Sequence, residues 1–395
     1  MARSRTVVIA GAGIGGLTCA LALIRRGFRA VVLEQAEALE AVGAGIQLSP
    51  NATRILAELG VTEPLARAVV APDEIRVLRS HNAREIVRGS IGPAAAFRYG
   101  APYWVVHRGD LQAALVERLQ ASSDGALHLG RRVEDFAAHA HGLTIETRTP
   151  AGPRQEHGIA LVGADGLWSR VRSRLGHDTP PRFAGRTAWR ATLPADVVPA
   201  EFRQPITWLW LGPEAHLVHY PVRAGTSVNI VAIIRDDWQS PGWSEPGDRA
   251  DIRARFSHWA AEPRALIETP ESWSKWALFD GPVLRAWSAG PVTLLGDAAH
   301  PILPFLAQGG AMAIEDGAVL AACLARSPDR PALAFETYQG LRRPRTQRVA
   351  RESRNNGMAY HLRGPAALAR NIALQRLRGE KLLKRYDWLY DWRAN

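Results

Sequence analysis

Hydrophobic and polar positions at the start of the chain follow first a strand pattern and then a helix pattern. Residues 6–10 form a continuous apolar run, which is typical of a strand buried on both faces of a parallel sheet. Apolar residues over 17–24 then recur at the spacing of one helix face, and Gly27 is placed to end that helix. A second apolar run covers residues 30–34. The pattern predicts a strand–helix–strand unit with parallel strands.

The middle of the chain has the two-residue period of antiparallel strands. Residues 73–100 alternate around turn signals and predict a hairpin inserted into the first domain, and 185–240 contain further amphipathic strands of a second sheet. A buried strand over 292–297 and a helix from about Gly310 follow. The last fifty residues have helical spacing, with an aromatic cluster over 386–392 that we interpret as an internal cap of the core. A dimer contact is the alternative.

The turn between the first strand and the first helix reads Gly-Ala-Gly-Ile-Gly-Gly over 11–16, and Glu34 lies 18 residues after Gly16. In a G-x-G-x-x-G turn, Gly11 permits the tight bend, Gly13 lets the backbone approach a pyrophosphate, and Gly16 allows close packing of helix on strand. The helix N-terminus would bind phosphate and Glu34 the ribose hydroxyls. The motif predicts a dinucleotide site without separating FAD from NAD.

A second pair of loops, Leu295–Pro301 and Gln308–Asp316, lies far along the chain. Asp297 at a strand end can bind ribityl hydroxyls, and Gly309 and Gly310 begin a helix whose positive end would face N1 and O2 of a flavin. Two such distant loops imply a long cofactor, so we predict FAD and no metal. The predicted cofactor contacts are Gly11, Gly13, Ile14, Gly15, Gly16, Glu34, Gln35, Arg108, Val133, Asp165, Asp297, Pro304, Gly309 and Gly310.

At these residues the chain resembles the aromatic-ring hydroxylase family of single-component flavoprotein monooxygenases. The markers of that family are the glycine-rich start, a "DG" motif and a "GD" motif, and here they are 11–16, Asp165-Gly166 and Gly296-Asp297. The resemblance covers nearly the whole chain and is greatest to salicylate, 3-hydroxybenzoate and 6-hydroxynicotinate hydroxylases. The closer similarity lies in residues 188–190, 216–221 and 296–316.

Together, the patterns and the resemblance predict an α/β fold. A Rossmann-like FAD-binding domain would be interleaved with a mainly antiparallel β-sheet substrate domain and followed by a C-terminal helical segment, with no separate NAD(P)H domain. We expect the FAD-binding domain to comprise 1–72, 101–178 and 276–345. The substrate domain would comprise 73–100 and 179–275, and the helical segment 346–395.

The resemblance implies an enzyme that takes a hydride from NADH or NADPH. It would use O2 to hydroxylate a small phenolic aromatic acid through a flavin C4a-hydroperoxide. The "DG" motif serves both FAD and NAD(P)H in this family, which suggests the same for Asp165. A phenol is attacked most readily when a general base removes its proton. His216 is the candidate base, and Tyr220 shares its strand face. The two match the substrate-site pair of the 3-hydroxybenzoate hydroxylases.

Several details of that site stay open in the sequence. An unperturbed histidine pKa near 6.5 suits proton abstraction at neutral pH. Pro304 and Phe305 are apolar where some relatives have a polar residue, and His300 either contacts the flavin or only fixes its loop. The substrate carboxylate could pair with any of three arginines, Arg84, Arg88 and Arg190.

Composition and charge restrict the compartment and the binding partners that we expect. The two cysteines cannot form a disulfide framework, and we find neither a signal-peptide core nor an apolar stretch long enough for a membrane span, so we expect a cytoplasmic protein. The formal net charge is +11, but the arginines are scattered, so nucleic acid is not an expected partner whereas anionic ligands are favoured. Monomer and homodimer both remain open.

Two other readings share the scaffold. One is a flavin monooxygenase, epoxidase or halogenase acting on a non-aromatic or N-heterocyclic substrate. A halogenase is disfavoured because the only three lysines, Lys275, Lys381 and Lys384, come late in the chain. The other is a flavin-binding protein without turnover.

Overall fold

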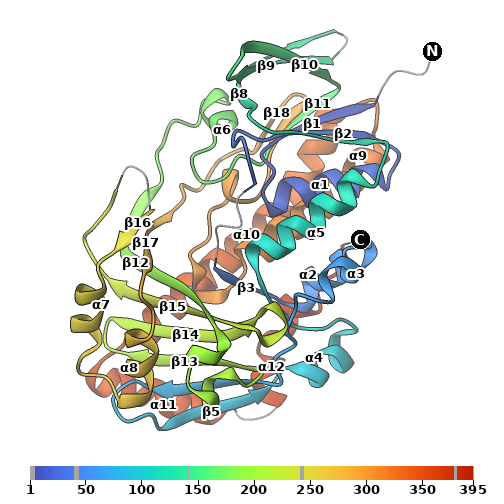
Figure 1. Cartoon of the computed structure of the whole chain (residues 1–395). Helices are drawn as coiled ribbons and strands as arrows, with labels where there is room; N and C mark the ends of the chain where they lie inside the picture. The colour runs from blue at the N-terminus through green and yellow to red at the C-terminus, as the bar shows by residue number, and fades with distance from the viewer. Residues whose placement is uncertain (1–4, 40–43, 141, 241–243, 378–379, 395) are drawn as a thin grey trace.

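The structure is a computed structural model, and it describes residues 5–39, 44–140, 142–240, 244–377 and 380–394 (Figure 1). A parallel sheet with its helices lies at one end of the molecule and a large antiparallel sheet at the other. Among the described residues, no helix is both long and apolar enough to cross a bilayer.

The parallel sheet has the strand order β18-β19-β11-β1-β2-β7, and only β18 runs antiparallel. Its strands come from the start, the middle and the last third of the chain. In the four inner strands, β19, β11, β1 and β2, the apolar residues are buried on both faces, as the unbroken hydrophobic runs predict. The strands are β1 (Thr6–Ala10), β2 (Arg29–Leu33), β7 (Gly125–His128), β11 (Ala160–Gly163), β18 (Ser288–Ala289) and β19 (Val292–Leu294).

Helices cover one face of this sheet and a small antiparallel sheet covers the other (Figure 1). Helix α1 packs against both α5 and α9, and α9 comes so near that a Cβ on Gly317 would lie 2.8 Å from the backbone nitrogen of Cys19. The layers are α1 (Ile14–Ile24), α5 (Arg108–Gln120) and α9 (Gly309–Arg326) on one side, and β8 (Arg132–His139), β9 (Gly142–Thr149) and β10 (Gly152–Gly158) on the other.

The large sheet has the order β16-β17-β12-β15-β14-β13-β4-β5 and is antiparallel except between β13 and β4. One face packs under α7 (Arg249–Phe256) and α8 (Ala261–Glu268) around a core that contains Trp210 and Phe256. The other face looks toward the parallel-sheet unit. The strands are β4 (Glu74–Arg79), β5 (Glu85–Ser90), β12 (Arg182–Pro194), β13 (Ile206–Gly212), β14 (Ala215–Val222), β15 (Ser227–Arg235), β16 (Ser244–Gly247) and β17 (Trp273–Asp280).

Some predicted elements have different limits in the structure. The hairpin expected over 73–100 ends at Ser90, and the alanine-rich stretch after it forms α4 (Gly92–Tyr99) because alanine favours helix. The strand expected over 292–297 ends at Leu294, because Gly296 turns the chain with φ of +60°. The first helix is capped by Gly27, as predicted: Gly27 has φ of +81°, its amide donates to the carbonyl of Ile24 at 2.9 Å, and the amide of Phe28 donates to that of Leu23 at 3.2 Å.

The C-terminal segment is helical, as predicted, and its aromatic cluster packs inward. Tyr390 meets Tyr99 and Tyr103 edge to face, with ring centroids 5.8 and 6.1 Å apart. The remaining elements are α2 (Pro50–Glu58), α3 (Thr62–Leu65), α6 (Arg170–Arg174), α10 (Pro331–Tyr360), α11 (Gly364–Gln375), α12 (Glu380–Lys384), α13 (Asp387–Tyr390), β3 (Gly45–Leu48) and β6 (Trp104–His107).

Candidate active site

The predicted cofactor motifs follow the carboxyl ends of four neighbouring parallel strands. The glycine turn follows β1, Glu34 follows β2, Asp165 follows β11 and Asp297 follows β19. The carboxyl ends of parallel strands lie at one edge of a sheet, and ligands bind in the crevice outside that edge. Motifs that stand almost 300 residues apart in the sequence therefore meet at one edge.

The glycines of the first turn are required for different local reasons. Gly11 has φ of +103°, and a Cβ there would lie 2.4 Å from the carbonyl oxygen of Ala164. A Cβ on Gly16 would lie 2.0 Å from the carbonyl oxygen of Gly11. At Gly13 a Cβ would meet no atom within 4 Å. Two glycines thus permit tight packing, and the third faces open space into which a phosphate can approach.

Glu34 holds the turn through backbone hydrogen bonds. Its two carboxylate oxygens accept from the amides of Ala12, at 2.8 Å, and Ala36, at 3.0 Å. Gln35 beside it is exposed. Val133 is buried, two residues after Arg131, whose amide donates to the carbonyl of Glu34 at 2.7 Å. The structure thus brings Glu34 and Val133 into one neighbourhood.

Arg108 connects the two predicted halves of the cofactor site. Burial lowers the pKa of its guanidinium, and the nearby charges of Asp297 and Glu34 raise it. Burial likewise raises the pKa of Asp297, whereas His300 and Arg108 lower it. Arg108 forms no ion pair with any described residue within salt-bridge distance. A half-buried guanidinium between two acidic loops can donate hydrogen bonds to the pyrophosphate of a dinucleotide.

The second loop is equally open. At Gly309 and Gly310, where α9 begins, an added Cβ would meet no atom within 4 Å. Pro304 starts a short 3-10 turn that ends at Ala307, which has the left-handed φ of +52°. These residues fit FAD, since both ends of the crevice have open glycine cradles and the half-buried guanidinium of Arg108 lies between them. When bound, FAD supplies hydride acceptance and oxygen activation.

Asp165 is engaged by its own turn. One oxygen accepts from the hydroxyl of Ser169 at 2.6 Å, and the other from the amides of Arg170, at 2.7 Å, and Val171, at 3.1 Å. The carboxylate thus satisfies the free amides at the start of α6. A cofactor contact by this side chain stays a prediction.

A buried ion network fixes the second loop, and the sequence analysis missed it. Asp316 accepts from the amide of Gly296 at 3.1 Å and pairs with Nε2 of His300 at 2.5 Å. Arg342 pairs with Asp316 and with Glu315 at 2.6 and 2.7 Å. His300 therefore fixes its loop, one of its two predicted roles. The sequence did contain one signal for this network. Glu315 and Asp316 are adjacent inside the apolar run of α9, and buried carboxylates need partners.

The inner face of the large sheet presents a row of polar side chains to the crevice. Tyr220 on β14 is paired with Asn229 on β15, which is paired with Thr192 on β12. The side-chain oxygen of Asn229 accepts from the amide of Gly45 at 2.6 Å, and a Cβ on Gly45 would lie 2.6 Å from the Tyr220 ring. This row of polar side chains therefore lies directly against β3, which belongs to the predicted FAD-binding domain.

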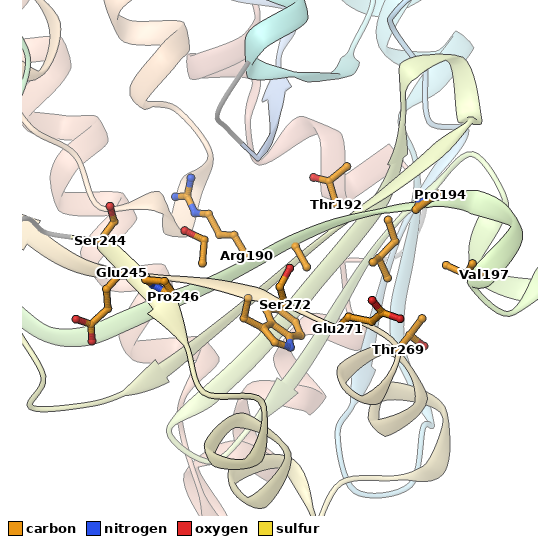
Figure 2. Close-up of a pocket in the computed structure, with 14 residues that line it drawn as sticks. Arg190, Thr192, Pro194, Val197, Ser244, Glu245, Pro246, Thr269, Glu271 and Ser272 are labelled. Atoms are coloured by element: carbon orange, nitrogen blue, oxygen red, sulfur yellow. The ribbon is translucent and has the colours of Figure 1, made fainter. Parts of the chain in front are cut away.

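Arg190 lies two residues before Thr192 on the same face. Nε of Arg190 and Nδ2 of Asn229 are buried and have no hydrogen-bond partner among the described residues. The Arg190 guanidinium lies over the Trp276 ring, 5.3 Å from its centroid. Burial lowers the pKa of Arg190, Tyr220 raises it and Arg108 lowers it. In Figure 2, Arg190 and Thr192 point to the same side of β12. Both also line an open pocket of about 830 Å³ at the edge of β12.

The other two arginines considered for a substrate carboxylate lie elsewhere. Arg84 and Arg88 are exposed near and on β5, the far edge strand of the large sheet. Arg88 pairs with Glu85 at 2.9 Å. Only Arg190 of the three faces the crevice, because β12 lies inside the sheet whereas the arginine side chains at the β5 edge point to solvent.

His216 lies on the face shared with Tyr220, whereas His219 lies on the other face among Trp208 and Trp210, as strand alternation predicts. The unperturbed histidine pKa near 6.5, which the sequence argument used, does not hold for His216. The ring is 2% exposed, and burial, His361 and Arg186 lower the pKa of His216 well below its ordinary value. The predicted base is therefore neutral at neutral pH.

Comparison with known proteins agrees with this geometry. The model of a family described as "FAD binding domain" matches residues 4–353. The chain is 38% identical to 3-amino-4-hydroxybenzoate 2-monooxygenase of Streptomyces platensis, over 99% of this chain and 97% of that protein. It is 36% identical to 3-hydroxybenzoate 6-hydroxylase of Polaromonas naphthalenivorans, over 98% and 96% of the two chains.

The chain belongs to the FAD-dependent aromatic-ring hydroxylases. Members of this family are monooxygenases, so the chain is an enzyme whose cofactor is FAD, with NAD(P)H as reductant and O2 as co-substrate.

Solved structures agree with the assignment. A salicylate hydroxylase in complex with its substrate has a TM-score of 0.82 and 25% identity, covering 100% of this chain and 97% of the other. Klebsiella pneumoniae HpxO complexed with FAD and uric acid has a TM-score of 0.84 at 24% identity, with 96% and 95% coverage, which shows the shared fold.

Proposed function

We propose that this hydroxylase acts on a small aromatic acid bearing a phenolic hydroxyl, with Arg190 binding the carboxylate and His216 removing the phenolic proton. The observation that carries the proposal is the placement, on one sheet face, of a guanidinium whose Nε has no hydrogen-bond partner among the described residues and of a buried, neutral imidazole. The relatives named for hydroxybenzoates have the same chemistry in their substrates.

The spacing of these groups suits one aromatic ring. Arg190 on β12 and Val218 on β14 are both register partners of Val231 on β15, and His216 and Tyr220 flank Val218. Two strand spacings separate β12 from β14, which is roughly 9–10 Å. A ring held across this gap places its carboxylate at the guanidinium and its hydroxyl near the histidine.

The remaining side chains complete the site. Burial raises the pKa of Tyr220 while Arg190 lowers it, so Tyr220 keeps its proton and can donate a hydrogen bond to the substrate. Leu303 and Phe305 in the loop after Asp297 are buried and apolar, and they exclude water from the reacting ring. We place the enzyme in the cytoplasm, because Cys19 and Cys323 are free buried thiols.

The first experiment supplies the FAD-loaded enzyme with NADH or NADPH and a panel of salicylate, hydroxybenzoates and hydroxypyridine carboxylates. Each reaction is scored by product mass, since cofactor consumption alone also reports uncoupled turnover. We expect one phenolic acid to gain a single oxygen atom. No oxygenated product from any acid of the panel would contradict the proposal.

The second experiment tests the carboxylate contact in Arg190→Leu. A hydrogen bond to a charged group contributes about 1.5–3 kcal/mol, so KM for the acid should rise about 10- to 150-fold. KM for the corresponding amide should change little, because the amide has no charge to lose. Arg88→Leu, at an exposed arginine, is the matched control. An equal change of KM for acid and amide would remove Arg190 from this role.

A further inference from the structure

A second histidine lies against the proposed base. Nδ1 of His216 and Nε2 of His361 are 2.7 Å apart, with ring centroids at 4.9 Å and ring planes tilted by 36°. His361 is 7% exposed and follows the last residue of α10. The two residues are 145 positions apart, so the sequence pattern gave no sign of the pair.

The surroundings of the pair are aromatic and cationic. Phe305 and Tyr360 meet the His216 ring with centroids 5.8 and 5.4 Å away. The charged groups that act on the pair are Arg186, on both rings, and Arg370, on His361. Among the described residues, no carboxylate acts on the pair. This setting disfavours a positive charge, so both rings are neutral in the resting enzyme, and one must donate its N–H to the other.

The direction of that hydrogen bond follows from the role proposed for His216. Its Nδ1 contacts Nε2 of His361, so only its own Nε2 can take up the substrate proton, and that Nε2 must carry a lone pair. A neutral His216 then has its proton on Nδ1, and Nε2 of His361 accepts this N–H. The proton of His361 is then on its Nδ1, which is buried and has no hydrogen-bond partner among the described residues.

We propose that His361 is a positioning residue that holds His216 in the Nδ1–H tautomer, with the Nε2 lone pair directed to the substrate hydroxyl. The inference rests on the proposed function. In the step it supports, the O–H bond of the phenol breaks and its electron pair stays on oxygen. The proton forms a bond to Nε2 of His216, and the Nδ1–H···Nε2 contact becomes charge-assisted and stronger. His361 itself gains and loses no proton.

A histidine partner and a carboxylate partner would affect the protonation of His216 differently. A carboxylate partner would orient the ring equally well, but it would also favour the imidazolium and leave His216 partly protonated near neutral pH. A neutral acceptor orients the ring without adding negative charge. The site therefore has an oriented base whose pKa is held below its ordinary value by burial, His361 and Arg186.

The tautomer is tested directly on the full-length, FAD-loaded protein without substrate. Nitrogen chemical shifts of ¹⁵N-labelled histidine are recorded at neutral pH, and the His216 signal is assigned by its loss in His216→Gln. We expect an unprotonated Nε2 and a protonated Nδ1 on His216, and an altered tautomer ratio in His361→Leu. The opposite tautomer, or an imidazolium, would overturn the proposal whatever compound the enzyme hydroxylates.

Turnover of the best acid in the panel supplies a second readout. In His361→Leu we expect kcat to fall about 10- to 100-fold, the range found when a group that orients a metal-binding histidine is removed, with little change of KM. His361→Gln, whose side-chain oxygen can accept the same N–H, should recover much of kcat. His361→Asp should add an acid limb to the pH profile of kcat, because the carboxylate raises the pKa of His216.

His219→Gln is the matched control, since His219 is a buried histidine on the opposite face of β14, where its Nδ1 accepts from Trp210 at 3.4 Å. It should leave the His216 tautomer and kcat unchanged. Flavin content and circular dichroism of every variant identify unfolding. An equal loss of kcat in His361→Leu and His361→Gln, in variants that retain FAD, would show a role in packing alone and overturn the proposal.

Discussion

Replacing Arg342 by methionine would remove the cation at the centre of the buried ion network. Arg342 is 1% exposed, and Glu315 and Asp316 are fully buried. Its nitrogens lie 2.7 Å from Glu315 and 2.6 Å from Asp316. Methionine fills a similar apolar volume, so the change isolates the loss of charge from the loss of packing.

The expected magnitude follows from what the carboxylates retain. Removing one partner of a buried pair costs about 3–5 kcal/mol, because the other charge stays buried and uncompensated. Glu315 keeps Arg345 at 2.6 Å, and Asp316 keeps His300 at 2.5 Å. We therefore expect a loss near the lower limit, about 3 kcal/mol of unfolding free energy.

The pH dependence carries a sign that can be checked. Burial raises the pKa of Asp316, but His300 and Arg342 outweigh it and hold the pKa at about 2, below the ordinary 3.8. That gap is worth roughly 2 kcal/mol, present above pH 4 and lost as the pH falls from 4 to 2. In Arg342→Met the pKa of Asp316 rises. The stability difference between wild type and variant should therefore be constant from pH 7 to pH 5 and narrow below pH 4.

Urea unfolding of the FAD-loaded proteins, followed by flavin fluorescence and circular dichroism, measures this difference. Arg348→Met is the control, because Arg348 is exposed on the same helix and lies over the Trp388 ring at 3.9 Å. A cation–π contact at an exposed site is worth about 0.5–1 kcal/mol. If Arg342→Met costs no more than Arg348→Met, the network does not stabilise the fold as argued.

Three further changes test the cofactor crevice. Gly16→Ala should abolish retention of FAD, because its Cβ would lie 2.0 Å from the Gly11 carbonyl, and a purified variant with full flavin absorbance would contradict the turn geometry. Arg108→Leu should weaken FAD binding to the apoprotein about 10- to 150-fold in a fluorescence titration, as expected when a charged hydrogen bond is lost, and unchanged affinity would argue against its place at the pyrophosphate. Asp165→Ala should cost about 1–2 kcal/mol in unfolding measurements by freeing the start of α6, and a neutral result would show that its hydrogen bonds do not stabilise the helix.

Most of the fold could be predicted from the sequence, because its strands and helices have local hydrophobic patterns. Buried parallel strands read as unbroken apolar runs, and β1, β2 and β19 begin within a residue or so of the predicted positions. The end of a strand or helix was harder to predict where the backbone conformation of one residue sets it. At Gly296, for example, a positive φ ends the strand early. The glycine turn and the acidic residues at the strand ends were visible because each has its own local signature.

The chemistry of the site was less visible because it depends on contacts between distant segments. His216 could be named from strand alternation and resemblance, but its partner His361 comes from another element and changes its pKa. Arg84, Arg88 and Arg190 looked alike in the sequence, and only the sheet order separates an exposed edge from a face turned to the crevice. Burial and pairing are properties of the folded chain, so composition and period could not supply them.

The packing of α1 against α9 has a consequence for synthesis. The apolar surface of α1 emerges from the ribosome with the first residues of the chain, but the helix that covers it begins only at Gly309. Nascent chains therefore carry an uncovered hydrophobic surface through most of translation, the condition in which aggregation competes with folding. A chain that stops short of α9 would be expected to need chaperones and to capture no flavin, which makes cofactor loading a late event in the life of the polypeptide.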